Sequence, residues 1–258
     1  MKTLLTLMAM LVAASVTHAA ADPRCVEMRV YYAPEGKLDA LHARFRDHTC
    51  KLFEKHGMTN LGYFVPIGPN PERKLIYFVA YPSLEARNAS WKAFMADPEW
   101  QKAHKASEVN GKLVAKVESV YLQATDYSPL AKAENIGNRV FELRTYTTEP
   151  GRLPNLNARF RDHTVKLFAK HGMTNLPYWN PMADQKGAVN PPDPKNTLIY
   201  LLAHKSEDAA KASFDAFRKD PDWVAARKAS EDKAGGSLTV KDGVKSVFLV
   251  ATDYSAVK

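Results

Sequence analysis

The chain has 258 residues and a formal net charge of +8, and its charged residues are interspersed rather than gathered in blocks. This pattern is typical of a solvated basic surface, and it also fits attraction of anionic ligands or of an anionic membrane face. No segment resembles a nucleic-acid-binding module, and there is no CxxC or HExxH motif, so we predict neither a nucleic-acid partner nor a zinc site.

The first 21 residues have the pattern of a secretory signal peptide. Lys2 gives a short positive end, Leu4 to Val16 form an apolar stretch, and Ala19-Ala20-Ala21 form a small-residue cleavage region. The apolar stretch is too short to span a membrane as a helix. We therefore predict a secreted protein, most simply periplasmic, that is soluble and has no transmembrane anchor. The alternative is that the N-terminal segment is retained as an anchor.

The rest of the chain carries one sequence twice. Residues 44–61 and 159–176 agree at sixteen of eighteen positions, at an offset of 115. Later in the chain the offset grows to 123 and then to 127, because the second copy contains insertions of eight and four residues. The repetition predicts two structural units, repeat 1 over 22–127 and repeat 2 over 139–258, with a linker over 128–138.

Both repeats show the same order of predicted elements. A long amphipathic helix follows the first strand and ends at a glycine suited to the left-handed conformation, and an Asp-Pro pair starts a short helix near the end. Repeat 1 has a strand at 25–32, a helix at about 37–56 before Gly57, strands through 63–65 and 75–81, a helix at about 83–96, a short helix from Asp97 and a strand at about 113–124. Repeat 2 has a strand at 140–147, a helix at about 152–171 before Gly172, strands through 178–179 and 198–204, a helix at about 206–219, a short helix from Asp220 and a strand at about 240–251.

This order, βαββαβ, predicts an α+β fold made of two tandem ferredoxin-like units. Each unit has a four-stranded sheet with helices on one face only, so its other face must be covered. Two copies can cover each other face to face and form a barrel-like core with the helices outside. Since the fused repeats already bury the faces that separate subunits would pair, we predict a monomeric pseudo-dimer or a weak homo-oligomer.

Two histidines interrupt the apolar stripes of the long helices. At 100° per residue, His48 and its counterpart His163 lie on the stripe that should face the sheet. A buried imidazole needs a partner. It can be a hydrogen-bonded core histidine, or an acid/base, metal or haem contact that faces a ligand between helix and sheet. The arginines of the same block are expected at the surface: Arg44, Arg46, Arg159 and Arg161.

The first strand of each repeat alternates between apolar and polar residues. If the apolar residues face the helices, the polar ones point into the lumen of the barrel. The polar set is Glu27, Arg29 and Tyr31 in repeat 1 and Glu142, Arg144 and Tyr146 in repeat 2. It can be an internal salt-bridge network that holds the repeats in register, or a pocket where Arg binds an anion and Tyr or Glu moves a proton. Tyr63 and Tyr178 are either core residues or a ligand platform.

Both cysteines, Cys25 and Cys50, lie in repeat 1, and repeat 2 has Val140 and Val165 in their places. Their joint occurrence in an exported protein favours a disulfide. The helical phase of Cys50, well off the apolar stripe, disfavours one. The sequence leaves this pairing open.

The motif F-R-x-H-T-x-x-L-F-x-K-H-G-M, preceded by E-L-R-T-Y-x-x-x-P-G, resembles the NIPSNAP family. Repeat 2 carries it from Glu142 to Tyr146, at Pro150-Gly151 and from Arg159 to Met173, and repeat 1 carries it from Glu27 to Tyr31 and from Arg44 to Met58. The resemblance covers nearly the whole mature chain. It implies an intramolecular version of the dimeric α/β barrel, the fold of several monooxygenases and of muconolactone isomerases. NIPSNAP proteins are known mainly as partners in vesicle and mitochondrial processes, so the resemblance supplies no catalytic residue and no cofactor.

Two functions fit these observations. The first is a module that binds a small anionic or aromatic molecule or a partner protein. The second is a small-molecule enzyme, either a cofactor-free or a haem-dependent monooxygenase or isomerase, that uses the two histidines or the Glu–Arg–Tyr sets. The lack of a nucleophile motif and of a metal signature favours the first, whereas the recurrence of the same polar residues in both copies supports the second.

Overall fold

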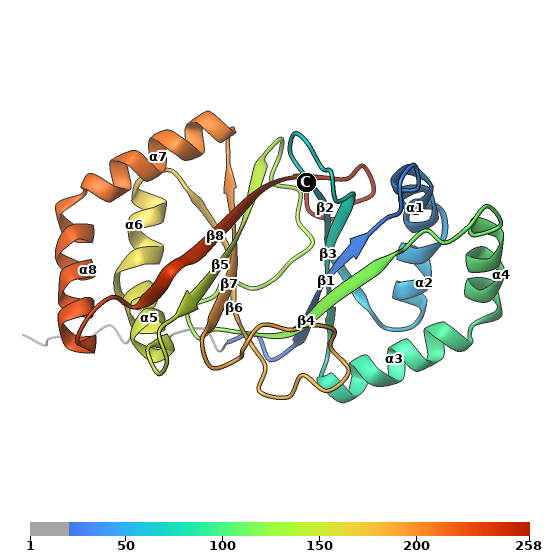
Figure 1. Ribbon diagram of the computed structural model, residues 1–258, viewed down its shortest axis with the longest axis horizontal. Helices are drawn as coiled ribbons and strands as arrows, with labels where there is room; N and C mark the ends of the chain where they lie inside the picture. The colour runs from blue at the N-terminus through green and yellow to red at the C-terminus, as the bar shows by residue number, and fades with distance from the viewer. Residues whose placement is uncertain (1–20) are drawn as a thin grey trace, which may run out of the picture.

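The computed structural model describes residues 21–258, so the predicted signal peptide lies outside the described residues except at its last position. Each repeat folds into four strands with helices on one side (Figure 1). The elements of repeat 1 are β1 (Cys25–Tyr32), α1 (Leu38–Arg44), η1 (Phe45–Thr49), α2 (Cys50–Lys55), β2 (Thr59–Pro66), β3 (Lys74–Tyr81), α3 (Leu84–Ala96), α4 (Pro98–Ser107) and β4 (Lys116–Ala124). Those of repeat 2 are β5 (Val140–Thr148), α5 (Leu153–Arg159), η2 (Phe160–Thr164), α6 (Val165–Lys170), β6 (Thr174–Pro181), β7 (Thr197–His204), α7 (Glu207–Lys219), α8 (Pro221–Ala234) and β8 (Thr239–Ala251).

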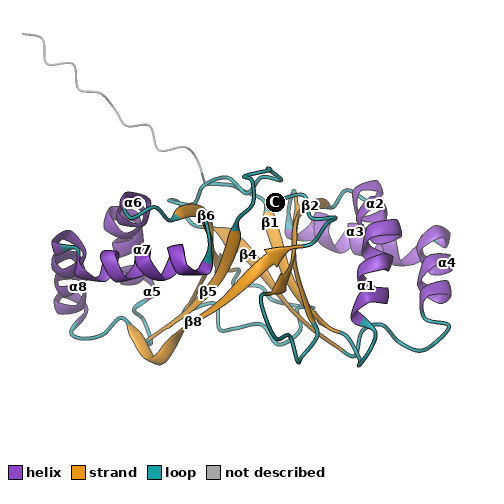
Figure 2. Ribbon diagram, turned by 90° about the horizontal axis from the view of Figure 1, so that it is seen from above, coloured by secondary structure: helices purple, strands orange, loops and turns teal. Residues whose placement is uncertain are grey.

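The strands form one closed antiparallel barrel, in the order β1-β3-β2-β8-β5-β7-β6-β4. Within each repeat the neighbours are those of a ferredoxin-like sheet, and the repeats join where β2 pairs with β8 and β4 pairs with β6. The helices lie outside the barrel on two opposite sides, those of repeat 1 on one side and those of repeat 2 on the other (Figure 2). The structure thus confirms the predicted fold class. None of the helices in residues 21–258 is long and apolar enough to cross a membrane.

The lumen of the barrel is apolar, which shows that the predicted orientation of the first strands was wrong. Val26 and Phe64 from repeat 1 pack there with Phe141 from repeat 2, and the rings of Phe78 and Trp179 stack at 5.4 Å. The polar residues Glu27, Arg29, Tyr31, Glu142, Arg144 and Tyr146 belong to the opposite, helix-facing side. Alternation fixes which residues share a face, but not which face is drier. The closed ring of strands surrounds the lumen, whereas the helix side offers charged partners and contact with water.

A wide turn interrupts each long helix and changes which residues are buried. The five residues Phe45–Thr49 and their counterparts Phe160–Thr164 form π-helical turns. A π turn holds an extra residue, so the buried face continues through Thr49 instead of His48. His48 and His163 are therefore exposed, and the expected buried imidazoles are not found. The same shift buries Arg44 and Arg159, which were expected at the surface.

Other local predictions are confirmed with small changes in boundaries. Gly57 and Gly172 follow the long helices with φ of 75° and 78°, the left-handed conformation that only glycine adopts freely. Asp97 and Asp220 cap α4 and α8 by accepting from backbone N–H groups two residues on. The closing strand of repeat 1 begins at Lys116 rather than near 113.

The two cysteines are not joined in the structure. Cys25 is buried and Cys50 half-buried, and both are free thiols. Burial raises the pKa of the Cys50 thiol to about 11.

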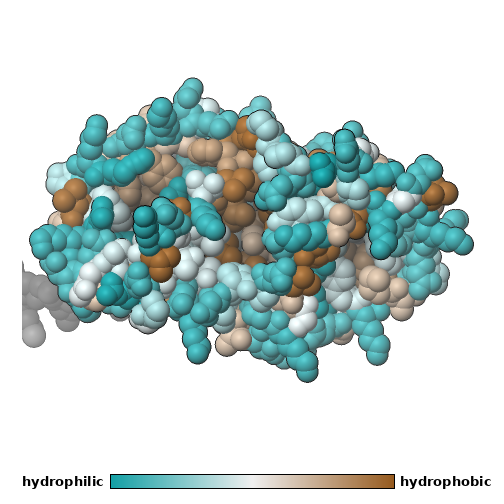
Figure 3. Space-filling model, viewed as in Figure 1, coloured by the Kyte–Doolittle hydropathy of each residue, from teal (hydrophilic) through white to brown (hydrophobic). Residues whose placement is uncertain are grey.

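Hydrophilic residues cover most of the molecular surface shown in Figure 3. Hydrophobic residues gather near its middle, between the helices of repeat 1 and those of repeat 2.

Candidate functional site

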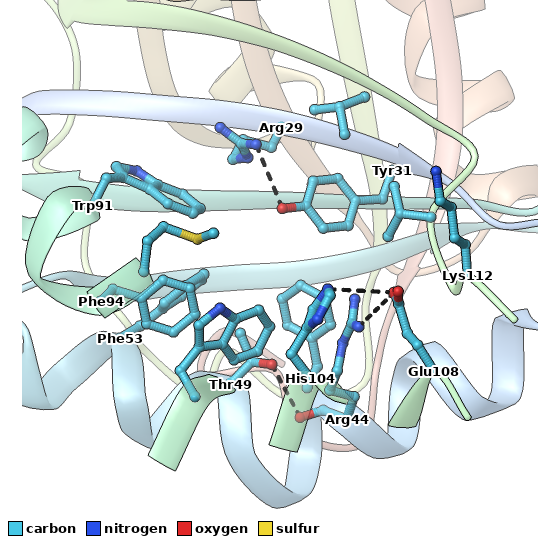
Figure 4. Close-up of a pocket in the computed structure, with 15 residues that line it drawn as sticks. Arg29, Tyr31, Arg44, Thr49, Phe53, Trp91, Phe94, His104, Glu108 and Lys112 are labelled. Atoms are coloured by element: carbon cyan, nitrogen blue, oxygen red, sulfur yellow. Dashed lines mark hydrogen bonds and ion pairs between the residues drawn. The ribbon is translucent and has the colours of Figure 1, made fainter. Parts of the chain in front are cut away.

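Repeat 1 contains a pocket of about 400 Å³ between the outer face of its sheet and its helices. Arg29 and Tyr31 of β1 form one wall, and Arg44 and Thr49 of the long helix form the opposite one (Figure 4). Aromatic side chains from the helices complete the lining: Phe45, Phe53, Trp91, Phe94 and Trp100. The pocket therefore combines cationic groups with aromatic surface, which suits a planar ligand that carries negative charge.

Repeat 2 has the equivalent pocket, of about 350 Å³. Both pockets have the same residue types on the first strand and on the long helix, at Arg29/Arg144, Tyr31/Tyr146, Arg44/Arg159, Phe45/Phe160, Thr49/Thr164 and Phe53/Phe168. They differ on the second and third helices, where Trp91, Met95 and His104 are replaced by Phe214, Arg218 and Arg227. The second pocket is therefore the richer in arginine.

Arg29 and Arg144 are fixed by the carboxylates of their own strands. Arg29 donates to Glu27 at 2.6 Å, and Arg144 donates to Glu142. Arg144 also donates from Nε to the hydroxyl of Tyr200 at 2.9 Å. Burial opposes the charge of Arg29, but Tyr31, Tyr77 and Glu27 outweigh it and hold the pKa of Arg29 well above its ordinary value. Both arginines thus remain cationic inside the protein.

Arg44 and Arg159 come from the turn just before the π turn. Thr49 stabilises that turn because its hydroxyl donates to the carbonyl of Arg44 at 3.1 Å, and Thr164 does the same for Arg159. Arg44 donates to Glu108 at 3.0 Å and lies over the Trp100 ring at 5.4 Å. Burial opposes ionisation of Glu108, but the Leu113 N–H and Arg44 outweigh it and lower its pKa.

Three of these guanidinium groups have unused hydrogen-bonding capacity. Within residues 21–258, the buried Nε atoms of Arg29, Arg44 and Arg159 have no hydrogen-bond partner. A buried polar atom without a partner is costly. Each of these three atoms therefore lacks the acceptor that would offset its burial.

The carboxylates beneath the two pockets have different surroundings. Glu27 accepts from Arg87 at 2.9 and 3.0 Å, from Trp91 at 3.0 Å and from Tyr81 at 3.1 Å, in addition to Arg29. Glu142 has Arg144 and, at 3.0 Å, the imidazole of His204. Burial opposes ionisation of both, yet Arg29 and Arg87 lower the pKa of Glu27, and His204 and Arg144 lower that of Glu142.

The structure brings together only some of the residues predicted from sequence. Arg29, Tyr31, Arg144 and Tyr146 line the pockets, and Glu27 and Glu142 support the arginines. Tyr63 and Tyr178 are buried in the core behind the pockets, where each donates to an asparagine at 2.5 Å. His48 and His163 lie on the outer surface of the helices. Across residues 21–258, no group of three or more His, Cys, Asp or Glu side chains is placed to hold a metal ion.

Sequence reasoning missed Arg44, Arg159 and the tryptophans Trp100 and Trp223. A signal for them was present, because both arginines fall in the most nearly identical block and both tryptophans follow a repeated Asp-Pro pair. The assumption of a regular helix hid the arginines. The tryptophans gave no periodic pattern that would assign them to a pocket.

Comparison with known proteins places the repeats in one family. The NIPSNAP family model matches residues 26–129 and 141–255. The chain belongs to the NIPSNAP family. A NipSnap homolog from Dictyostelium discoideum is 26% identical over an alignment of 183 positions, and the match covers 67% of this chain and 69% of that protein.

Solved structures share the fold of the whole tandem NIPSNAP chain. A putative monooxygenase from Lactobacillus acidophilus NCFM covers 89% of this chain with 94% of its own, at a TM-score of 0.53 and 10% identity. An anthrone oxidase-like protein covers 91% with 94% of its own, at a TM-score of 0.53 and 14% identity. At these identities the likeness concerns the fold alone.

Proposed function

We propose that this NIPSNAP protein binds small aromatic anions, one in each helix-to-sheet pocket. The observation that carries the proposal is the pairing, in both pockets, of one buried and one partly buried arginine with an aromatic wall. Charged hydrogen bonds from guanidinium to a carboxylate are among the stronger ones in proteins, and aromatic walls bury a planar ring well. The excess of basic residues over the whole chain also favours the approach of an anion.

Retention of the lining in both repeats supports ligand binding over a purely structural role. Internal ion pairs account for the Glu–Arg contacts of the first strands. Arg44 and Arg159 enter the pockets from the other wall, where each has one carboxylate partner, Glu108 at 3.0 Å and Glu231 at 3.8 Å, and each keeps an Nε atom without a partner. A carboxylate ligand between the two arginines of each pocket would add an acceptor for their guanidinium groups.

Tryptophan indole resonances test this proposal site by site. We would titrate ¹⁵N-labelled protein with 4-(hydroxymethyl)benzoate and with its neutral analogue 1,4-benzenedimethanol. Trp91 and Trp100 report on the first pocket, Trp223 on the second, and Trp179 in the barrel lumen is an internal control. We expect the carboxylate to shift the pocket signals while that of Trp179 stays in place, and the alcohol to bind about tenfold more weakly.

A double variant in the second pocket locates the anion. Arg227 and Arg218 line only repeat 2 pockets and are more than half exposed, so their replacement by Gln should leave the fold intact. The double variant should weaken binding seen at Trp223 and leave binding at Trp100 unchanged. Equal affinity for the carboxylate and the alcohol, or no shift at any pocket tryptophan, would overturn the proposal.

We further propose that the protein acts after export. The support is the signal-peptide pattern of residues 1–21. Expression of the full chain in a Gram-negative host should give a periplasmic product whose mass corresponds to a start at Asp22. An intact chain in the cytoplasm would contradict this.

A further inference from the structure

The two pockets differ in what covers their flank. At the first pocket, the segment of repeat 2 between β6 and β7 lies along the edge of β4 of repeat 1. Ser119 N–H donates to the Val189 carbonyl at 2.9 Å, Tyr121 N–H to the Gln185 side chain at 2.9 Å, and Met182 N–H to the Tyr121 carbonyl at 2.8 Å. This segment carries the eight-residue insertion of the second copy. The flank of the first pocket is therefore sealed by the other repeat.

The corresponding edge of β8 is open. Ser246, the counterpart of Ser119, is exposed, whereas Ser119 is 3% exposed. The shorter segment between β2 and β3 makes one backbone bond to this stretch, from Ile67 N–H to the Phe248 carbonyl at 2.9 Å. Phe248, the counterpart of the fully buried Tyr121, is only half-buried.

Side-chain differences inside the two repeats also leave the second pocket more open than the first. Arg87 and Trp91 fill the space beside Glu27, and Trp91 is held there by its bonds to Glu27 and to Tyr81. Repeat 2 has Ala210 and Phe214 at these places. Arg87 packs over the Tyr121 ring at 4.7 Å, and alanine cannot make that contact with Phe248.

The result is a second hollow, of about 440 Å³, beside the second pocket. The two cavities share Arg144, Phe214 and Arg218 in their linings. The hollow is lined beyond them by Glu207, Asp208, Lys211, Ser246, Phe248 and Glu142. It therefore combines two ring surfaces with hydrogen-bonding groups of both charges, and Arg218, 58% exposed, can move aside where the two cavities meet.

We infer that the two sites have diverged in ligand length, and that repeat 2 takes an elongated aromatic anion whose polar far end extends past Phe214 into the hollow at Ser246. This inference rests on the proposed function of the pockets. The anionic end lies among the arginines of the second pocket, and the far end is neutral and polar because the hollow offers both acidic and basic partners. The first site holds only the short form, because Trp91 and Arg87 close the same path.

Two probes that differ only in length test the inference. They are 4-(hydroxymethyl)benzoate and 4'-(hydroxymethyl)biphenyl-4-carboxylate, which share the carboxylate and the hydroxymethyl group. With indole resonances as the readout, the long probe should bind at Trp223 about tenfold more tightly than the short one. At Trp100 the long probe should bind no better than the short one.

A plug in the hollow is the matched variant. Ser246→Phe should remove the advantage of the long probe at Trp223 and leave the affinity for the short probe unchanged, while Ser246→Ala should keep both. Ser246 is exposed, so both variants are expected to fold, and circular dichroism checks this. An equal gain for the long probe at both sites, or a gain that survives Ser246→Phe, would overturn the inference. Failure of the short probe at both sites would instead overturn the proposed function.

Discussion

The imidazole Nε2 of His204 lies 3.0 Å from a carboxylate oxygen of Glu142, at the place where repeat 1 has the hydroxyl of Tyr81 beside Glu27. Both carboxylates are almost fully buried, but Glu27 has two guanidinium partners and Glu142 has one. The buried carboxylate of the first strand thus has more positively charged partners in repeat 1 than in repeat 2. This difference leads to the first two predictions.

Arg144→Met should destabilise the protein more than Arg29→Met. Removal of Arg144 leaves Glu142 with His204 alone, and breaking a buried pair costs about 3–5 kcal/mol. Removal of Arg29 leaves Glu27 bound to Arg87, so the loss should be smaller. Urea unfolding of both variants at neutral pH measures the difference. Equal losses would show that Arg87 does not compensate.

Glu142→Gln should flatten the acid end of the stability profile. The pKa of Glu142 is below its ordinary value of 4.5, so its contribution to stability is fully present above that pH and is lost as the pH falls through the lowered folded-state pKa. The wild type should therefore exceed the Gln variant in free energy of unfolding near neutral pH, and the gap should shrink below about pH 4.5. Urea melts across this range provide the test, and a gap that widens in acid would contradict it.

Thr164→Val should cost about 1–3 kcal/mol, because it leaves the buried Arg159 carbonyl without the Thr164 hydroxyl. Thr164→Ser keeps the hydroxyl and is the control. The Val variant should also weaken ligand binding reported by Trp223, since the turn positions Arg159. A Val variant as stable as the Ser variant would mean that the π turn does not need this bond.

His163→Leu should change the free energy of unfolding by less than about 0.5 kcal/mol, as is usual at surface sites. The imidazole is exposed and lies outside both arginine pockets. Ligand shifts at Trp223 should also stay as in the wild type. Loss of ligand binding in a stable His163→Leu variant would return this residue to the list of functional groups.

A chain of residues 22–130 should form a homodimer or aggregate. Alone, repeat 1 would expose the lumen face that carries Phe64 and Phe78, and it would lose the pairing of β2 with β8 and of β4 with β6. Analytical ultracentrifugation measures the outcome. A stable folded monomer would show that one repeat does not need the other.

The internal repeat determined the order of elements and the pairing of two sheets into a barrel, because a ferredoxin-like sheet has one uncovered face wherever it occurs. The helix caps at Gly57 and Asp97 could also be predicted from the sequence, because backbone conformation and capping bonds depend on neighbours in the chain. For the site, the strand pattern identified the Arg29 and Arg144 sets as groups that act together.

Only the tertiary structure decided where those groups point and what completes the pockets. Alternation of polar and apolar residues defines the two faces of a strand but does not show which face is buried in the barrel. The closed barrel has an apolar lumen, so the polar face with Glu27 and Arg29 lies toward the helices. The π turns changed the helical phase by an extra residue, so that Arg44 entered the pocket and His48 reached solvent. The sealing of one flank by the segment around Val189 depends on the contact between Ser119 and Val189, which are 70 residues apart in sequence. No local pattern encodes such contacts, because their energies arise only when distant segments meet.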